Sequence, residues 1–85
     1  MLKIAHRINT IEQLKQTPGE YGVEMDLRPF GDKIIIHHDA FKEGEDFEEW
    51  LKYYQHALLI LNTKAEGMED RILELMEKHK IENYC

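Results

Sequence analysis

The 85-residue chain has a single cysteine, two prolines and five glycines, and it contains no long apolar run. Because the only cysteine is Cys85, an internal disulfide is excluded, and we expect a protein of a reducing compartment, the cytoplasm. No apolar stretch approaches the ~20 residues that cross a bilayer. The N-terminal residues also lack the pattern of a signal peptide. We therefore expect no transmembrane segment.

Concentrated positive charge is also missing from this sequence. There are 17 acidic residues against 11 lysines and arginines, which gives a formal net charge of -6. Affinity for a phosphate backbone comes from clustered cations, so we expect no nucleic-acid partner. The length allows one modest domain, residues 1–85, with a correspondingly small core.

Apolar periodicity predicts strands alternating with helices along the chain. We expect strands over 2–5, 21–28, 33–38, 57–61 and 81–85. We expect helices from a cap at Asn9 or Thr10 to 17–19, over 46–56 and over 68–79, with a turn at 29–32. Such alternation indicates an α/β fold with a parallel sheet. In these folds functional residues gather at the carboxyl ends of the strands.

Two neighbouring stretches carry the residues of greatest chemical interest. In GVEMDLR, apolar and polar residues alternate, so Glu24 and Asp26 share one face of a strand. Two carboxylates placed side by side repel each other unless a cation lies between them. The stretch IIIHHD adds His38 and Asp39 at the end of the hairpin partner. Together these residues suggest the start of a metal-assisted active site, while a solvated face on which Arg28 pairs with one acid is the alternative.

Four blocks, taken in chain order, resemble the glycerophosphodiester phosphodiesterases and the wider phosphatidylinositol-phospholipase-C-like barrels. The blocks are His6-Arg7 followed by Asn9-Thr10, then Glu24-x-Asp26, then His38-Asp39, then Asn62-Thr63-Lys64. Ile8 stands where the family usually has glycine, and Asn62 stands where the family usually has glutamate. The resemblance covers essentially the whole chain.

The resemblance implies the N-terminal portion of a (β/α)8 TIM barrel, with about three β/α units plus a hairpin strand. A complete barrel takes typically ~250 residues. We therefore expect either a part of a longer protein or an open sheet completed by association. Self-association through the open sheet edge follows from that expectation, because an exposed edge strand invites pairing.

The resemblance also implies a role for each matching residue in the cleavage of a small-molecule phosphodiester. His6 and His38 would be the acid–base pair. The ligands of a divalent metal, Mg²⁺ or Ca²⁺, would be Glu24, Asp26 and Asn62. The phosphate would lie near Arg7 and Lys64, with Asp39 and Asn9 in support.

Two other interpretations remain open at this point. The chain is alternatively a non-catalytic or degenerate barrel piece that serves assembly or binding, which Asn62 and the length favour. A histidine-ligated Zn²⁺ site is a weaker third option, because the ligand set is mainly oxygen. We interpret the acidic stretch 43–49 as a solvated loop and helix start, His37 as a bystander, and His56 and His79 as surface or dipole-compensating residues.

Overall fold

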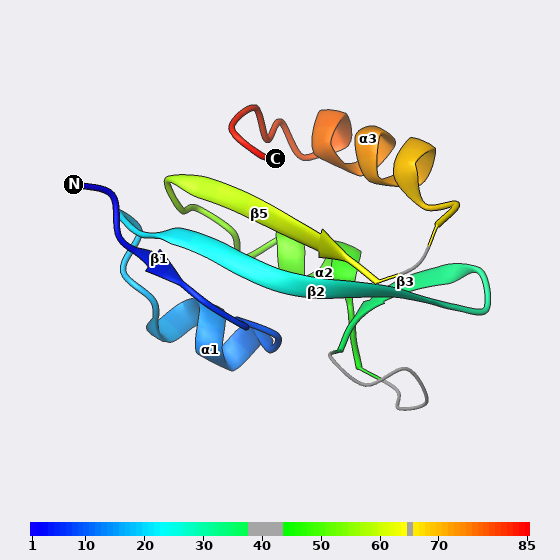
Figure 1. The fold of residues 1–85 in the computed structure, drawn as a ribbon, viewed down its shortest axis with the longest axis horizontal. Helices are drawn as coiled ribbons and strands as arrows, with labels where there is room; N and C mark the ends of the chain where they lie inside the picture. Colours follow the sequence, from blue (N-terminus) through cyan, green and yellow to red (C-terminus); the bar gives the residue numbers. More distant parts are fainter. Residues whose placement is uncertain (38–43, 65) are drawn as a thin grey trace.

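The computed structural model describes residues 1–37, 44–64 and 66–85. Within these ranges the chain forms a five-stranded sheet and three helices, which confirms the α/β class (Figure 1). The elements in chain order are β1 (Ile4–Ala5), α1 (Ile11–Gln16), β2 (Gly22–Phe30), β3 (Lys33–Ile36), β4 (Glu45–Asp46), α2 (Phe47–Leu51), β5 (Leu58–Thr63) and α3 (Glu69–Lys78). Among the described residues, none of the helices has the length and apolarity that a membrane crossing requires.

The long strand β2 organises the sheet. On one side its first half pairs with β1 in parallel, and its second half pairs with β3 in antiparallel. On the other side β5 runs parallel to it, in register from Gly22↔Leu58 to Leu27↔Thr63. The last residues continue this parallel series, because Tyr84 forms a bridge with Leu59. The predicted parallel strands therefore lie side by side in the order in which the chain supplies them.

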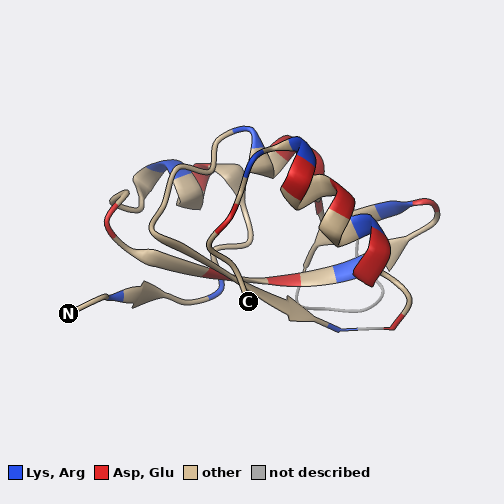
Figure 2. Ribbon diagram, turned by 90° about the horizontal axis from the view of Figure 1, so that it is seen from above, with Lys and Arg blue, Asp and Glu red and all other residues tan. Residues whose placement is uncertain are grey.

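Within residues 1–37, 44–64 and 66–85, the three helices cover one face of the sheet and leave the other face without a helix (Figure 2). The alternation in GVEMDLR decides which residues of β2 enter the core. Val23, Met25 and Leu27 are fully buried in the hydrophobic cluster that also contains Phe47 and Trp50 of α2. The polar residues of the same strand consequently lie on the helix-free face, as the period of two requires.

Side-chain caps define the starts of the first two helices. The Thr10 hydroxyl accepts a hydrogen bond from the Gln13 N–H at 3.1 Å, and Asp46 caps α2 in the same way. The second helix ends at Leu51, earlier than predicted, because the next backbone N–H groups bond three residues back rather than four. Tyr54 still stacks on Trp50, with ring centroids 5.9 Å apart, and burial raises the pKa of Tyr54 to about 12.

The hairpin and the segment after it differ from the sequence-based expectation. The strand β2 continues through Pro29 and Phe30, so the predicted turn at 29–32 is too long. A tight turn at Gly31 and Asp32 replaces it, and Gly31 has the positive φ of 63° that glycine adopts without strain. The acidic stretch contributes a short strand, β4, paired with β3, where we expected only a loop and a helix start.

Candidate functional site at the carboxyl ends of the parallel strands

Residues from three parallel strands meet on the helix-free face at their carboxyl ends. Asp26 of β2 lies directly beside Asn62 of β5. His6 follows β1, whose register pairs Ala5 with Val23, so His6 arrives at the level of Glu24. Lys64 follows β5 and is anchored by its backbone N–H, which donates to the carbonyl oxygen of Leu27 at 2.9 Å. The sheet register therefore brings these side chains together.

Asp26 is the centre of this arrangement, and it is a buried carboxylate with only 2% of its surface exposed. Asn9 bonds to it twice: its amide Nδ2 donates to Asp26 Oδ2 at 3.0 Å, and its Oδ1 accepts the Asp26 backbone N–H at 3.0 Å. Asn62 Nδ2 donates to Asp26 Oδ1 at 3.1 Å, and Lys64 Nζ lies 3.4 Å from the same oxygen. The cost of burying this charge is offset by these donors and by the lysine.

Glu24 is held by the loop that follows β1. Its Oε1 accepts the Arg7 backbone N–H at 3.3 Å and lies 3.5 Å from His6 Nδ1. The carbonyl oxygen of Glu24 accepts the Ile8 N–H at 2.9 Å. Arg7 has a φ of 53°, a left-handed conformation that is uncommon for a residue other than glycine. The His6 side chain is 71% exposed, so the histidine that contacts Glu24 is open to a ligand from solvent.

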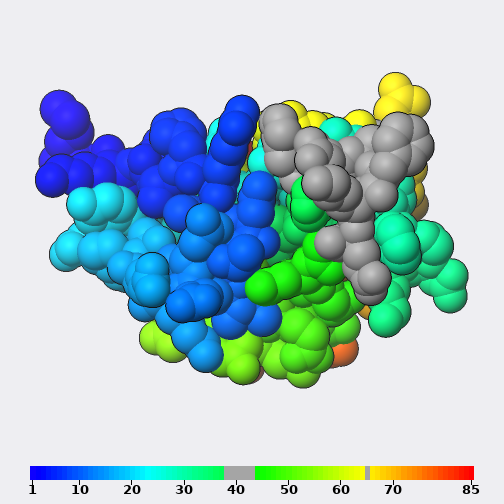
Figure 3. All heavy atoms as spheres, turned by 90° about the horizontal axis from the view of Figure 1, so that it is seen from below, coloured from blue at the N-terminus to red at the C-terminus, as the bar shows by residue number. Residues whose placement is uncertain are grey.

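An open cavity of about 450 Å³ lies beside the site, between the start of α1 and the strands β3 and β4. Arg7, Asn9, Gln13, His37 and Glu45 are among the residues that line it. In Figure 3 the blue N-terminal segment lies against the green segment around 44–52, and the Glu45 carboxylate accepts the Ile11 N–H at 2.6 Å. Arg7 and Asn9 therefore line this cavity and also contact the two carboxylates.

The structure places most of the predicted site residues in two neighbouring groups of contacts. Glu24 contacts His6 and Arg7, and Asp26 contacts Asn9, Asn62 and Lys64. The predicted residues His38 and Asp39 lie outside the described part of the chain. Arg7 reaches Glu24 through its backbone rather than its guanidinium. Asn62 presents an N–H group, not its oxygen, to Asp26.

The oxygen ligands at this site are of the kind that a divalent cation prefers, but they are few. Two carboxylates from one strand face supply the hard oxygens that Mg²⁺ and Ca²⁺ prefer. Among residues 1–37, 44–64 and 66–85, no group of three or more His, Cys, Asp or Glu side chains is placed to hold a metal ion. The amide of Asn62 also carries an oxygen, so a third possible metal ligand, which is neutral, is present beside Asp26.

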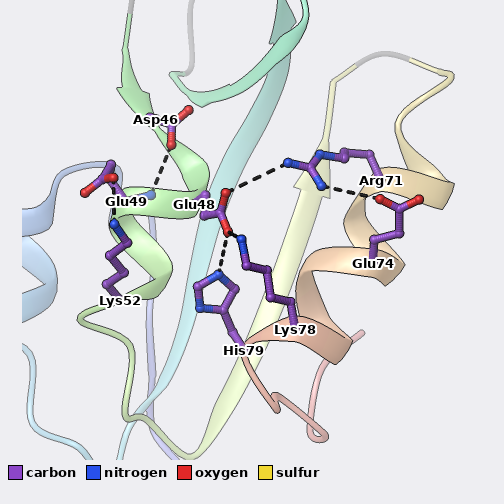
Figure 4. A network of polar contacts seen from close by, with 8 residues as sticks. All are labelled: Asp46, Glu48, Glu49, Lys52, Arg71, Glu74, Lys78 and His79. Atoms are coloured by element: carbon purple, nitrogen blue, oxygen red, sulfur yellow. Dashed lines mark hydrogen bonds and ion pairs between the residues drawn. The ribbon is translucent and has the colours of Figure 1, made fainter.

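A second polar cluster joins α2 to α3, and the sequence did not predict it. Glu48 of α2 contacts three residues of α3 and its C-terminal end: Lys78 Nζ at 2.7 Å, His79 Nε2 at 3.0 Å and Arg71 at 3.9 Å (Figure 4). Hydrogen bonds from Lys78 and His79 lower the pKa of Glu48 to about 2. The interpretation of His79 as a dipole-compensating surface residue missed this partner, which lies 31 residues away in the sequence.

Comparisons with known proteins add no family assignment to this geometry. A scan against protein-family models, a search of curated proteins and a search of solved structures each found no match to the chain. The function of the chain is therefore inferred from the geometry of the site itself.

Proposed function

We propose that this chain is the opening part of a β/α barrel that binds a small phosphodiester at the carboxyl ends of its parallel strands and supports its metal-dependent hydrolysis. The observation that carries the proposal is the convergence on Asp26 and Glu24. Both acids lie on the helix-free face. Glu24 contacts His6 and Arg7, which follow β1, and Asp26 contacts Asn62 and Lys64 at the end of β5. Active sites of β/α barrels occupy this end of the strands.

The composition of the helix-free face supports the barrel interpretation. Near the amino-terminal ends of the parallel strands, the neighbouring residues on this face are Ile4, Gly22 and Leu58. The next levels are Glu24 beside Ile60, then Asp26 beside Asn62. The face thus changes from apolar to polar toward the strand ends, as in a barrel whose filled interior leads up to a site at its carboxyl rim.

In the proposed reaction Glu24 and Asp26, with Asn62, would hold Mg²⁺ or Ca²⁺. A divalent ion there supplies Lewis-acid stabilisation of the charge that develops on a phosphodiester. His6, beside Glu24 and exposed to solvent, is suited to proton transfer, because an imidazole ring can both accept and donate a proton. His38 would be its counterpart, as the resemblance implies. The cations Arg7 and Lys64 would neutralise the phosphate oxygens.

Two measurements on the intact chain test the proposal. Calorimetry measures the binding of Ca²⁺ or Mg²⁺, and an activity assay measures the hydrolysis of bis(4-nitrophenyl) phosphate with and without EDTA. We expect a dissociation constant on the order of 1 mM, because two carboxylates make a weak site. The variant Glu24→Gln should lower the affinity by about tenfold and abolish metal-dependent turnover. Glu20→Gln, a change of equal charge at an exposed loop residue, should leave both unchanged. Equal ion binding by the wild type and Glu24→Gln would contradict the proposal.

A second candidate is a non-catalytic piece that acts in binding or assembly. The specific observation in its favour is that Asp26 is already bonded to N–H donors from Asn62 and to the Lys64 ammonium. In that case the polar network would be structural, and the sheet would associate through its edge or its helix-free face. Absence of Ca²⁺ and Mg²⁺ binding, combined with association that increases with protein concentration, would favour this candidate over the phosphodiesterase.

A further inference from the structure

Lys64 holds a position that is unusual for a surface lysine. It lies immediately after β5, and its backbone is fixed by the hydrogen bond to the Leu27 carbonyl oxygen. Its ammonium is 3.4 Å from Asp26 Oδ1, and its side chain is only 26% exposed. The pair therefore joins a buried carboxylate to a lysine whose side chain is mostly covered, not two fully solvated side chains at the surface.

The same oxygen of Asp26 also accepts the hydrogen bond from Asn62. Oδ1 is thus shared by two N–H donors, one of them carrying a full positive charge. A carboxylate oxygen in that environment is less available to a metal ion, because the two cations repel each other and compete for the same lone pairs. A screened surface pair would have little effect, but burial of Asp26 reduces the screening here.

We propose that Lys64 is an internal cation of this site, which a divalent metal must displace from Asp26 in order to bind. This inference rests on the proposed function, since it concerns the same two carboxylates. It assigns Lys64 a role in setting ion affinity through its charge and position. Lys64 is then a determinant of whether the site operates with a metal ion at all.

The experiment compares Ca²⁺ binding by calorimetry in the wild type and in Lys64→Met, which removes the charge but retains an unbranched apolar stem. We expect Lys64→Met to bind Ca²⁺ about tenfold more tightly. Lys64→Arg, which keeps the charge, should bind with the wild-type affinity or more weakly. Lys80→Met, at an exposed position after α3, changes the net charge by the same amount and should leave the affinity unchanged.

A thermal unfolding series gives an independent readout. Without Ca²⁺, Lys64→Met should unfold at a lower temperature than the wild type, because the buried Asp26 loses its countercharge. With Ca²⁺ in excess, the variant should gain more in unfolding temperature than the wild type gains. If Lys64→Met does not fold, Lys64→Gln serves instead, since its amide still offers a hydrogen bond to Asp26, and a smaller increase in affinity is expected.

The outcomes separate this inference from the proposed function. Suppose that the wild type binds Ca²⁺ through Glu24 and that Lys64→Met binds it equally or more weakly. That result overturns the role of Lys64 and leaves the proposed function in place. Absence of Ca²⁺ binding and of any Ca²⁺-dependent shift in both proteins overturns the proposed function and this inference with it. Tighter binding by Lys64→Met and not by Lys80→Met supports the internal cation.

Discussion

At the scale of single residues, Asp26 is the position at which the candidate site and the stability of the fold meet. Its carboxylate is buried, and its contacts come from the loop after β1, from β5 and from the residue after β5. A buried charge requires such partners, because its desolvation is otherwise costly. The site residues are therefore also structural residues, and mutations among them act on folding and on ligand binding together.

Asn9 offers the clearest test of this dual role. Its side chain both donates to the Asp26 carboxylate and accepts the Asp26 backbone N–H. We expect Asn9→Ala to lower the free energy of unfolding by about 2 kcal/mol, since two hydrogen bonds to a buried group are lost. Urea denaturation measures this change. Gln16→Ala, at an exposed position of the adjacent helix α1, should change the stability by less than about 0.5 kcal/mol. Equal stabilities for Asn9→Ala and the wild type would show that the Asn9 contacts contribute nothing.

At the scale of elements, the sequence predicts the strands and helices that have a clear apolar period. The third helix was expected over 68–79 and is found at Glu69–Lys78, and the alternation in GVEMDLR correctly assigns the buried face of β2. The sequence could also place Glu24 and Asp26 on one face, because that follows from the period of two alone.

The remainder depends on tertiary contacts that no local pattern encodes. The strand β4 has two residues and exists through pairing with β3. The contacts of Lys64 and Asn9 with Asp26 span 38 and 17 residues, so their geometry requires the assembled sheet register. The early end of α2 follows from a tightened last turn, which its apolar stripe does not reveal.

The cluster around Glu48 provides a pH-dependent test of how α3 is attached to α2. The pKa of Glu48 falls from 4.5 to about 2 in the fold, chiefly through hydrogen bonds from Lys78 and His79. A carboxyl whose pKa is lowered by folding stabilises the fold at pH values above its unfolded pKa. It loses that contribution as the pH falls through the folded value. We expect Glu48→Gln to be less stable than the wild type by about 1 kcal/mol at pH 7. The difference should shrink below pH 4.5 and vanish near pH 2.

Chemical denaturation at a series of pH values measures this difference. Glu74→Gln is the matched control, because Glu74 belongs to the same cluster but is 69% exposed and bonds only weakly to Arg71 at 3.4 Å (Figure 4). Its effect should stay within about 0.5 kcal/mol at every pH. A Glu48→Gln difference that does not vary with pH would contradict the assigned cause of the stabilisation.

At the scale of the whole molecule, the decisive feature is a sheet that the helices of the described residues cover on one face only (Figure 2). Within the described residues β1 pairs with β2 alone, so it forms an edge of the sheet. Ile4 of this strand is 37% exposed, and Leu58 and Ile60 on the helix-free face are only half-buried. An edge strand next to exposed aliphatic residues favours association with further strands, from a barrel or from another copy.

We therefore expect the 85-residue chain to self-associate weakly, with a sedimentation coefficient that rises with protein concentration. Ile4→Lys places a charge on the edge strand and should shift the sedimentation coefficient toward the monomer value at every concentration. Leu73→Lys makes the same change at a 53% exposed residue of α3, on the helical layer, and should leave the concentration dependence as in the wild type. A monomer at all concentrations, or an equal effect of the two variants, would show that the edge and the helix-free face do not mediate association. A selective effect of Ile4→Lys would locate the contact at β1, on the side of the sheet where the polar site also lies.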